Sequence, residues 1–96
     1  MDKLHSSIDR QSADFKENEA YNLGLRQELM ERLEQVKKGG GDKYVDRHHK
    51  RGKLLPRERI ERILDDGSPF IELSSLAADG VYETDVPSAG VVSGVG

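Results

Sequence analysis

The sequence predicts an α+β or α/β fold in which a helical region, residues 12–67, precedes the first strands of a second region, residues 68–96. Apolar residues of the first region recur at steps of four, four and three, as Leu25, Leu29, Leu33 and Val36. After Pro69 the composition changes to short apolar runs separated by glycine, which is typical of strands. Residues 1–11 show no periodicity and are expected to form a loose arm.

The longest helix is expected over residues 13–38. Ser12 is its candidate N-cap, because a serine hydroxyl can accept a hydrogen bond from an orphan amide of the first turn. The run Gly39-Gly40-Gly41 ends the pattern, since glycine favours helix termination. Gly24 lies inside the pattern, costs about 1 kcal/mol relative to alanine, and marks a weak point.

A second, shorter helix is expected over residues 42–50. Asp42 is its candidate cap, because a carboxylate oxygen can satisfy a free amide at the helix start. Gly52 follows its end, where glycine is favoured.

A third helix is expected to begin at Pro56, because the first helical position tolerates the missing N–H of proline. Ile60, Ile63 and Leu64 form its apolar stripe, and Gly67 is the expected terminating residue. The pairs Arg57–Glu61 and Glu58–Arg62 have i,i+4 spacing on the solvent side. Each such pair contributes a few tenths of a kcal/mol, on the order of 0.2–0.5.

Two strands are expected after the helices. The first is Phe70–Leu73, and the second lies within residues 89–96, AGVVSGVG, with an irregular connection over 74–87. We expect the second strand to lack a partner, which leaves an exposed edge of the kind that stable domains avoid. On this interpretation the sequence is truncated within a larger domain.

Composition supports the same interpretation. The hydrophobic residues, counted without glycine, make up 34% of the chain, against roughly 45% apolar residues, counted with glycine, in ordinary globular domains. There is no cysteine for a disulfide or a thiolate zinc site. Ordering each residue costs about 1–2 kcal/mol of backbone entropy, which apolar burial must offset. We therefore do not expect a self-sufficient domain.

The sequence indicates neither export nor membrane insertion. No apolar run reaches the length of about 18 residues that a spanning helix needs, and residues 1–20 lack an apolar signal core. Five acidic residues in that stretch argue against an organellar transit peptide. A cytoplasmic location is expected, or the mitochondrial matrix in a eukaryote.

The positive charge is concentrated in the basic run, residues 47–62, which carries seven Lys or Arg and two Glu, a net of +5 in a chain of net −3. Three explanations stay open: packing or assembly against acidic surface, binding of an anionic ligand, and nucleic-acid binding. The last is disfavoured by a pI of about 5.6 and by the absence of aromatic residues between Tyr44 and Phe70.

No catalytic constellation is visible. His48 and His49 point about 100° apart on a helix and cannot easily hold one metal ion. Asp65 and Asp66 are interpreted as turn-forming carboxylates, and the segment Gly94-Val95-Gly96 is too short for a dinucleotide fingerprint. Ser93 lacks the context of a nucleophile elbow. We predict no catalytic, cofactor-binding or metal-binding residue.

The segment RGKLLPRERI, residues 51–60, followed by Gly67-Ser68-Pro69-Phe70, resembles the amino-terminal region of the carboxyltransferase (β) subunits of biotin-dependent acyl-CoA carboxylases. The triple glycine and the later VPSAGVVSGVG, residues 86–96, occur in the order that this family shows. The LLPRER and SPF forms are most similar to the methylcrotonoyl-CoA carboxylase branch. Asp66 and Ser88 depart from the family, which often has Pro and Gly there.

The resemblance covers about residues 12–96 and implies a crotonase-like carboxyltransferase domain, built as a superhelix of ββα units, that begins near residue 68 and is truncated here. It implies a hexameric β core with α subunits that carry biotin and consume ATP and bicarbonate. It implies carboxyl transfer from carboxybiotin to 3-methylcrotonyl-CoA in leucine degradation. This segment is expected to bind no cofactor and to be inactive alone, because no position matches the family's active-site loops.

Two alternatives remain at this point. A propionyl-CoA or geranyl-CoA type of carboxylase β subunit differs only in its acyl pocket, which nothing here lines. A small helical adaptor that binds an acidic partner through residues 47–62 belongs to another functional class. The basic run is also a candidate site for CoA phosphates, through Lys50, Arg51 or Lys53, on grounds of charge alone.

Overall fold

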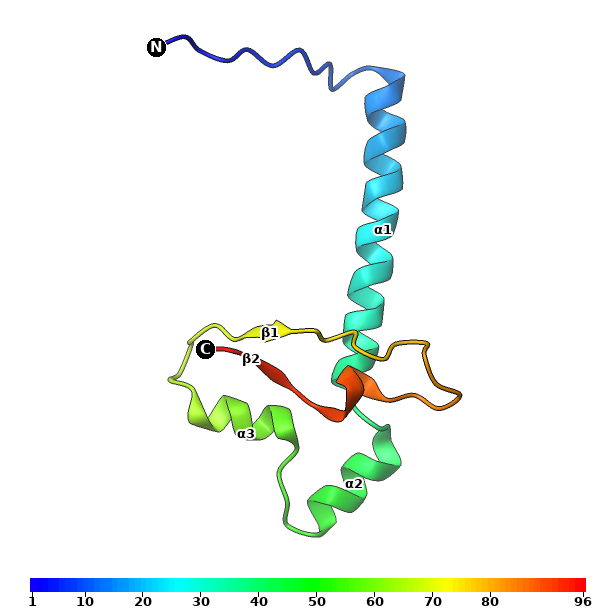
Figure 1. Ribbon diagram of the computed structural model, residues 1–96, viewed down its shortest axis with the longest axis vertical. Helices are drawn as coiled ribbons and strands as arrows, with labels where there is room; N and C mark the ends of the chain where they lie inside the picture. Colours follow the sequence, from blue (N-terminus) through cyan, green and yellow to red (C-terminus); the bar gives the residue numbers. More distant parts are fainter. The chain divides into compact units, whose positions relative to one another are not determined.

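The computed structural model describes residues 1–96 and contains helices α1, α2 and α3, strand β1, a short 3-10 segment η1 and strand β2, in that order (Figure 1). The predicted order of helices before strands is confirmed. The chain divides into two compact units, Met1–Glu31 (unit 1) and Arg32–Gly96 (unit 2). None of the helices combines the length and apolar character needed to cross a lipid bilayer.

Helix α1 spans Ala13–Lys37, within one residue of the prediction. Ser12 caps it as expected, because the Phe15 amide donates to the Ser12 hydroxyl at 3.2 Å. The predicted weak point at Gly24 does not interrupt the helix. Lys37 lies in the last turn, where a cation interacts favourably with the helix dipole.

The apolar stripe of α1 is covered at one end only. Leu25 and Leu29 are each 47% exposed, whereas Leu33 is half-buried and Val36 is buried, at 8% exposure. Val36 is the one buried apolar side chain of the whole chain. The apolar core is therefore small, and it lies in unit 2.

Helix α2 spans Asp42–Lys50, as predicted. Its expected cap is wrong by one position: Gly41, at φ 93°, is the N-cap, and no side chain caps the helix. Asp42 is instead the first helical residue, and its negative charge in the first turn is favourable near the positive end of the helix dipole.

Helix α3 spans Pro56–Ile63 and begins as predicted, but it ends before Gly67. Leu64 already has extended dihedral angles, φ −75° and ψ 151°. Gly67, at φ 76°, lies instead in a turn, where the Ser68 amide donates to the Asp65 carbonyl at 2.9 Å. The helix start is closed by Glu58, whose carboxylate accepts from the Leu55 amide at 2.6 Å.

Strands β1, Ile71–Leu73, and β2, Ser93–Val95, form a two-stranded antiparallel sheet in which Glu72 lies opposite Gly94 (Figure 1). The expectation that the last strand lacks a partner is therefore wrong, because β1 pairs with it. The second strand is also shorter than expected, since Pro87–Gly90 forms η1.

The absence of a side chain at Gly94 explains how the two strands approach each other so closely. A Cβ atom on Gly94 would lie 2.3 Å from the Ile71 carbonyl oxygen and 2.5 Å from Cζ of Phe70. Only glycine, which has no Cβ, permits such a close approach of ring and backbone at this position. Gly94 thus lets β2 lie against β1 beneath the Phe70 ring.

Candidate functional site

The structure separates the basic run into one inward cation and six outward ones. Arg57 is half-buried. The others are exposed to solvent: Arg47, Lys50, Arg51, Lys53, Arg59 and Arg62. The packing explanation therefore holds for Arg57.

Arg57 joins α3 to two distant segments of unit 2. Its Nη1 donates to Oε2 of Glu72 on β1, and its Nη2 donates to the Ser88 hydroxyl at 3.4 Å. The Ser88 hydroxyl in turn donates to the Ser75 carbonyl at 3.1 Å. The predicted partner Glu61 is not used, because Glu72 presents a less exposed carboxylate on the inner side of β1.

Ser88 is the most deeply buried polar residue, at 5% exposure, and it has a positive φ of 52°. Such a backbone conformation favours glycine, which the resemblance suggested for this position. The serine side chain offsets the strain through its two hydrogen bonds.

Glu72 depends on Arg57. Its side chain is 15% exposed, and its buried Oε1 has no hydrogen-bond partner. A half-satisfied carboxylate in a partly buried position requires its neighbouring cation, since an unpaired buried charge is strongly unfavourable.

The two histidines hold the corner between α2 and α3. His48 Nε2 bonds the Leu54 carbonyl at 3.1 Å, and His49 Nε2 bonds both carboxylate oxygens of Glu58, at 2.9 and 3.0 Å. The Leu55 amide, and secondarily His49, lower the pKa of Glu58 below its ordinary value of 4.5. No group of three His, Asp, Glu or Cys side chains is placed to hold a metal ion.

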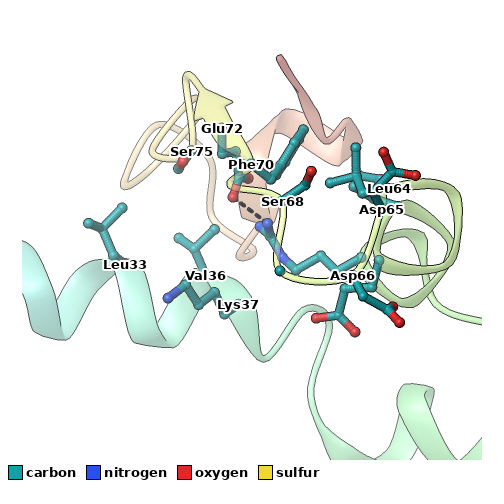
Figure 2. Close-up of a pocket in the computed structure, with 14 residues that line it drawn as sticks. Leu33, Val36, Lys37, Leu64, Asp65, Asp66, Ser68, Phe70, Glu72 and Ser75 are labelled. Atoms are coloured by element: carbon teal, nitrogen blue, oxygen red, sulfur yellow. Dashed lines mark hydrogen bonds and ion pairs between the residues drawn. The ribbon is translucent and has the colours of Figure 1, made fainter. Parts of the chain in front are cut away.

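Unit 2 contains a groove of about 670 Å³ beside these contacts (Figure 2). Its apolar lining is contributed by the last turns of α1, by α3 and by the segment before β1. These residues are Leu33, Val36, Ile60, Leu64 and Phe70. Arg57 and Glu72 lie at one side, and the dashed line in Figure 2 marks their ion pair.

The remaining residues singled out from the sequence have structural positions. Asp65 and Asp66 are exposed at the groove. A turn is present at Asp65–Ser68, but its hydrogen bond is accepted by the Asp65 backbone carbonyl rather than by a carboxylate. Ser93 donates its hydroxyl to the Leu73 carbonyl at 3.5 Å. Gly94 and Val95 lie in β2.

Sequence reasoning missed Glu72, Ser88 and the groove. One signal was available for Glu72, since a charged residue between Ile71 and Leu73 breaks the apolar run of a strand. Ser88 carried no signal of burial, because its partners lie 13 and 31 positions away.

The proteins that are similar over most of the chain include three carboxylase beta subunits. "Probable methylcrotonoyl-CoA carboxylase beta chain, mitochondrial" of Drosophila melanogaster is 53% identical over 94 residues, 97% of this chain. The methylcrotonoyl-CoA carboxylase beta chain of Arabidopsis thaliana is 45% identical over 93 residues, also 97%. The biotin-dependent 3-methylcrotonyl-coenzyme A carboxylase beta1 subunit of Mycobacterium tuberculosis is 51% identical over 69 residues, 72% of the chain.

The alignments cover 16%, 16% and 13% of the lengths of these relatives. The family described as carboxyl transferase domain matches residues 47–96. That match includes every member of the hydrogen-bonded network Arg57–Glu72–Ser88–Ser75. The chain belongs to the carboxyl transferase domain family.

Proposed function

We propose that these residues form the amino-terminal part of a carboxyltransferase subunit that transfers a carboxyl group from carboxybiotin to 3-methylcrotonyl-CoA. The observation that carries the proposal is the 53% identity over 94 residues with the Drosophila relative, which is named as a probable methylcrotonoyl-CoA carboxylase beta chain. The segment contributes scaffold rather than chemistry, because its least exposed polar contacts join α3 to β1 and to the η1 segment.

The geometry supports this division of roles. Arg57 belongs to the RERI motif, Glu72 to the strand that follows SPF, and Ser88 to the later PSAG segment. The three motifs that carry the family likeness are therefore joined by one side chain, Arg57. This contact holds helix α3 against strand β1 and against the η1 segment.

The proposal extends to the rest of the enzyme. Residues 68–96 are the start of a crotonase-like superhelix, residues 12–67 its helical leader, and residues 1–11 an arm. Biotin is carried by a partner α subunit, six β subunits form the core, and the location is the cytoplasm or the mitochondrial matrix. Acyl-CoA and carboxybiotin bind outside the present segment.

A chimeric enzyme tests the proposal. The aligned 94 residues of the Drosophila β chain are replaced by those of this chain, and the product is purified with its biotin-carrying subunit. We expect ATP-dependent fixation of labelled bicarbonate into 3-methylcrotonyl-CoA at a rate comparable with the parent, and lower rates with propionyl-CoA and geranyl-CoA. A chimera that folds, assembles and fixes no label contradicts the proposal.

A matched control separates scaffold from chemistry. The same chimera carrying Arg57→Met is expected to lose assembly or thermal stability, with an unchanged KM for acyl-CoA in the fraction that assembles. An altered KM with intact assembly would instead place this segment at the substrate.

A further inference from the structure

The turn between α3 and β1 has the dipeptide Asp66-Gly67 at its centre. The Ser68 amide closes the turn by donating to the Asp65 carbonyl at 2.9 Å. Gly67 has a φ of 76°, and Asp66 is not among the residues of positive φ. These signs are those of a type II turn, which needs a positive φ at its third residue and therefore favours glycine there.

The dipeptide Asp79-Gly80 occupies the same place in a second turn. The Val81 amide closes this turn by donating to the Ala78 carbonyl at 3.3 Å. Gly80 has a φ of 67°, close to that of its counterpart in the first turn. The two Asp-Gly dipeptides therefore match in sequence and in their positions within the turn.

The two turns differ in what holds the aspartate side chain. The Asp79 carboxylate pairs with the Arg32 guanidinium at 3.0 Å, whereas the Asp66 carboxylate makes no hydrogen bond or ion pair. Neither glycine amide donates a hydrogen bond, because the bond that closes a β-turn uses the amide of the fourth residue. Asp66 therefore combines an unrestrained carboxyl group with a neighbouring amide nitrogen that is free to react.

We propose that Asp66-Gly67 is a site of isoaspartyl formation and that Arg32 slows the same reaction at Asp79. The Gly67 nitrogen bonds to Cγ of the protonated Asp66 carboxyl group, and the amide proton leaves with the carboxyl hydroxyl as water. Water then opens the cyclic imide. Attack at the Asp66 backbone carbonyl carbon gives the isoaspartyl form, in which the chain runs through Cγ, and attack at Cγ restores aspartate. Water is released and then taken up, so the reaction needs no other reactant and no partner protein.

The ion pair explains the expected difference in rate. The carboxyl group of Asp79 must leave the Arg32 guanidinium before Cγ can reach the Gly80 nitrogen. The two side chains are 39% and 54% exposed, so their pair has the modest strength of a surface ion pair. This strength corresponds to a rate that is about twofold to fivefold lower at Asp79 than at Asp66. The inference does not depend on the proposed carboxylase function.

Ageing of the full-length chimera with the Drosophila β chain tests the proposal, because both sites then lie in one complete subunit. The aged protein is digested with endoproteinase Glu-C, which cleaves after Glu61, Glu72 and Glu83 and so places each Asp-Gly dipeptide on its own peptide. Electron-transfer fragmentation distinguishes the isoaspartyl from the aspartyl form and gives the rate at each site. Each rate is divided by the rate of the same site in the denatured protein, which removes effects of neighbouring residues.

We expect the normalised rate at Asp66 to exceed that at Asp79 by about twofold to fivefold. Arg32→Gln should raise the rate at Asp79 by a similar factor and leave the rate at Asp66 unchanged. The control Arg26→Gln removes the same charge elsewhere on α1 and should change neither rate. Asp66→Glu keeps the negative charge but should form no isomer at this position, because its longer side chain would have to close a larger and less favourable ring.

Three results would overturn the proposal. The first is an equal or higher normalised rate at Asp79. The second is an Arg32→Gln variant in which Asp79 reacts no faster than in the Arg26→Gln control. The third is the absence of isoaspartate at Asp66 in the folded subunit while it forms in denaturant, since the turn would then be held in an unreactive conformation.

Discussion

In unit 1 the side-chain hydrogen bonds join residues two to four positions apart, whereas in unit 2 they reach much farther along the chain. Asn22 donates to the Asn18 carbonyl and Gln27 to Glu31, both at 2.8 Å. Arg57 instead bridges 15 positions to Glu72, and Arg32 bridges 47 positions to Asp79 at 3.0 Å. Unit 1 therefore depends on interactions between residues close in sequence, and unit 2 depends on contacts between residues far apart in sequence.

The middle of α1 has no covered apolar stripe. Leu25 and Leu29 are half exposed, yet the helix runs without a break through Gly24. The Ser12 cap, strong helix formers and a length of 25 residues favour the helix locally, because propagation adds one hydrogen bond per residue fixed. The sheet has no such local basis, since a two-stranded ribbon is only marginally stable by itself.

The largest expected effect comes from Arg57→Met. The substitution leaves the Glu72 carboxylate, 15% exposed, without its cation. We expect unit 2 to lose about 2–3 kcal/mol of stability, somewhat below the loss for a fully buried pair. Hydrogen exchange of the β1 amides measures the loss, and exchange of the amides in residues 13–31 should not change.

The double variant Arg57→Met, Glu72→Met is the control. It removes both charges and should recover part of the lost stability, because no unpaired carboxylate remains. If the single variant accelerates exchange in residues 13–31 as much as in β1, unit 1 does not depend on local interactions alone.

A smaller effect is expected from Gly94→Ala. The new methyl group would meet the Ile71 carbonyl oxygen at 2.3 Å, and a backbone atom cannot move aside as a side-chain end can. We expect a destabilisation of about 1–3 kcal/mol, typical of overpacking, together with loss of the β1–β2 amide protection.

The same substitution in unit 1, Gly24→Ala, is the matched control with the opposite sign. Nothing lies within 4 Å of a Cβ at this position, so alanine should stabilise α1 by about 0.5–1 kcal/mol. Helicity by circular dichroism checks the gain. A stabilising Gly94→Ala would show that the strands separate freely in solution.

The smallest effect is a pH dependence at the α2–α3 corner. The pKa of Glu58 lies below 4.5 because the Leu55 amide and His49 bond its carboxylate. Its contribution to stability is therefore present above pH 4.5 and is lost as the pH falls through the lowered pKa. The Leu55 amide proton shift, followed from about pH 6 to about pH 3, reports this titration.

Glu58→Gln removes the titrating group while keeping an oxygen that can accept from the Leu55 amide. The Leu55 shift should then stay constant across the acid range. A wild-type midpoint at or above 4.5 would contradict the observed contacts of Glu58.

Local features were the ones that could be predicted. The Ser12 cap, the stop at the triple glycine and the start at Pro56 follow from the backbone preferences of single residues. The end of α3 was missed, because Leu64 leaves the helix to line the groove. The position of the helix end depends on the packing of Leu64 beside residues far away in the sequence, such as Leu33 and Val36.

The amino-acid sequence by itself determined where the three helices lie and, through RGKLLPRERI and VPSAGVVSGVG, which family the chain resembles. Only the tertiary structure decided which of seven cations turns inward, which carboxylate it meets and which strand pairs with β2. Helical periodicity and capping act over about four residues. A contact across 15 to 47 positions instead depends on how the intervening chain closes, which no local pattern specifies.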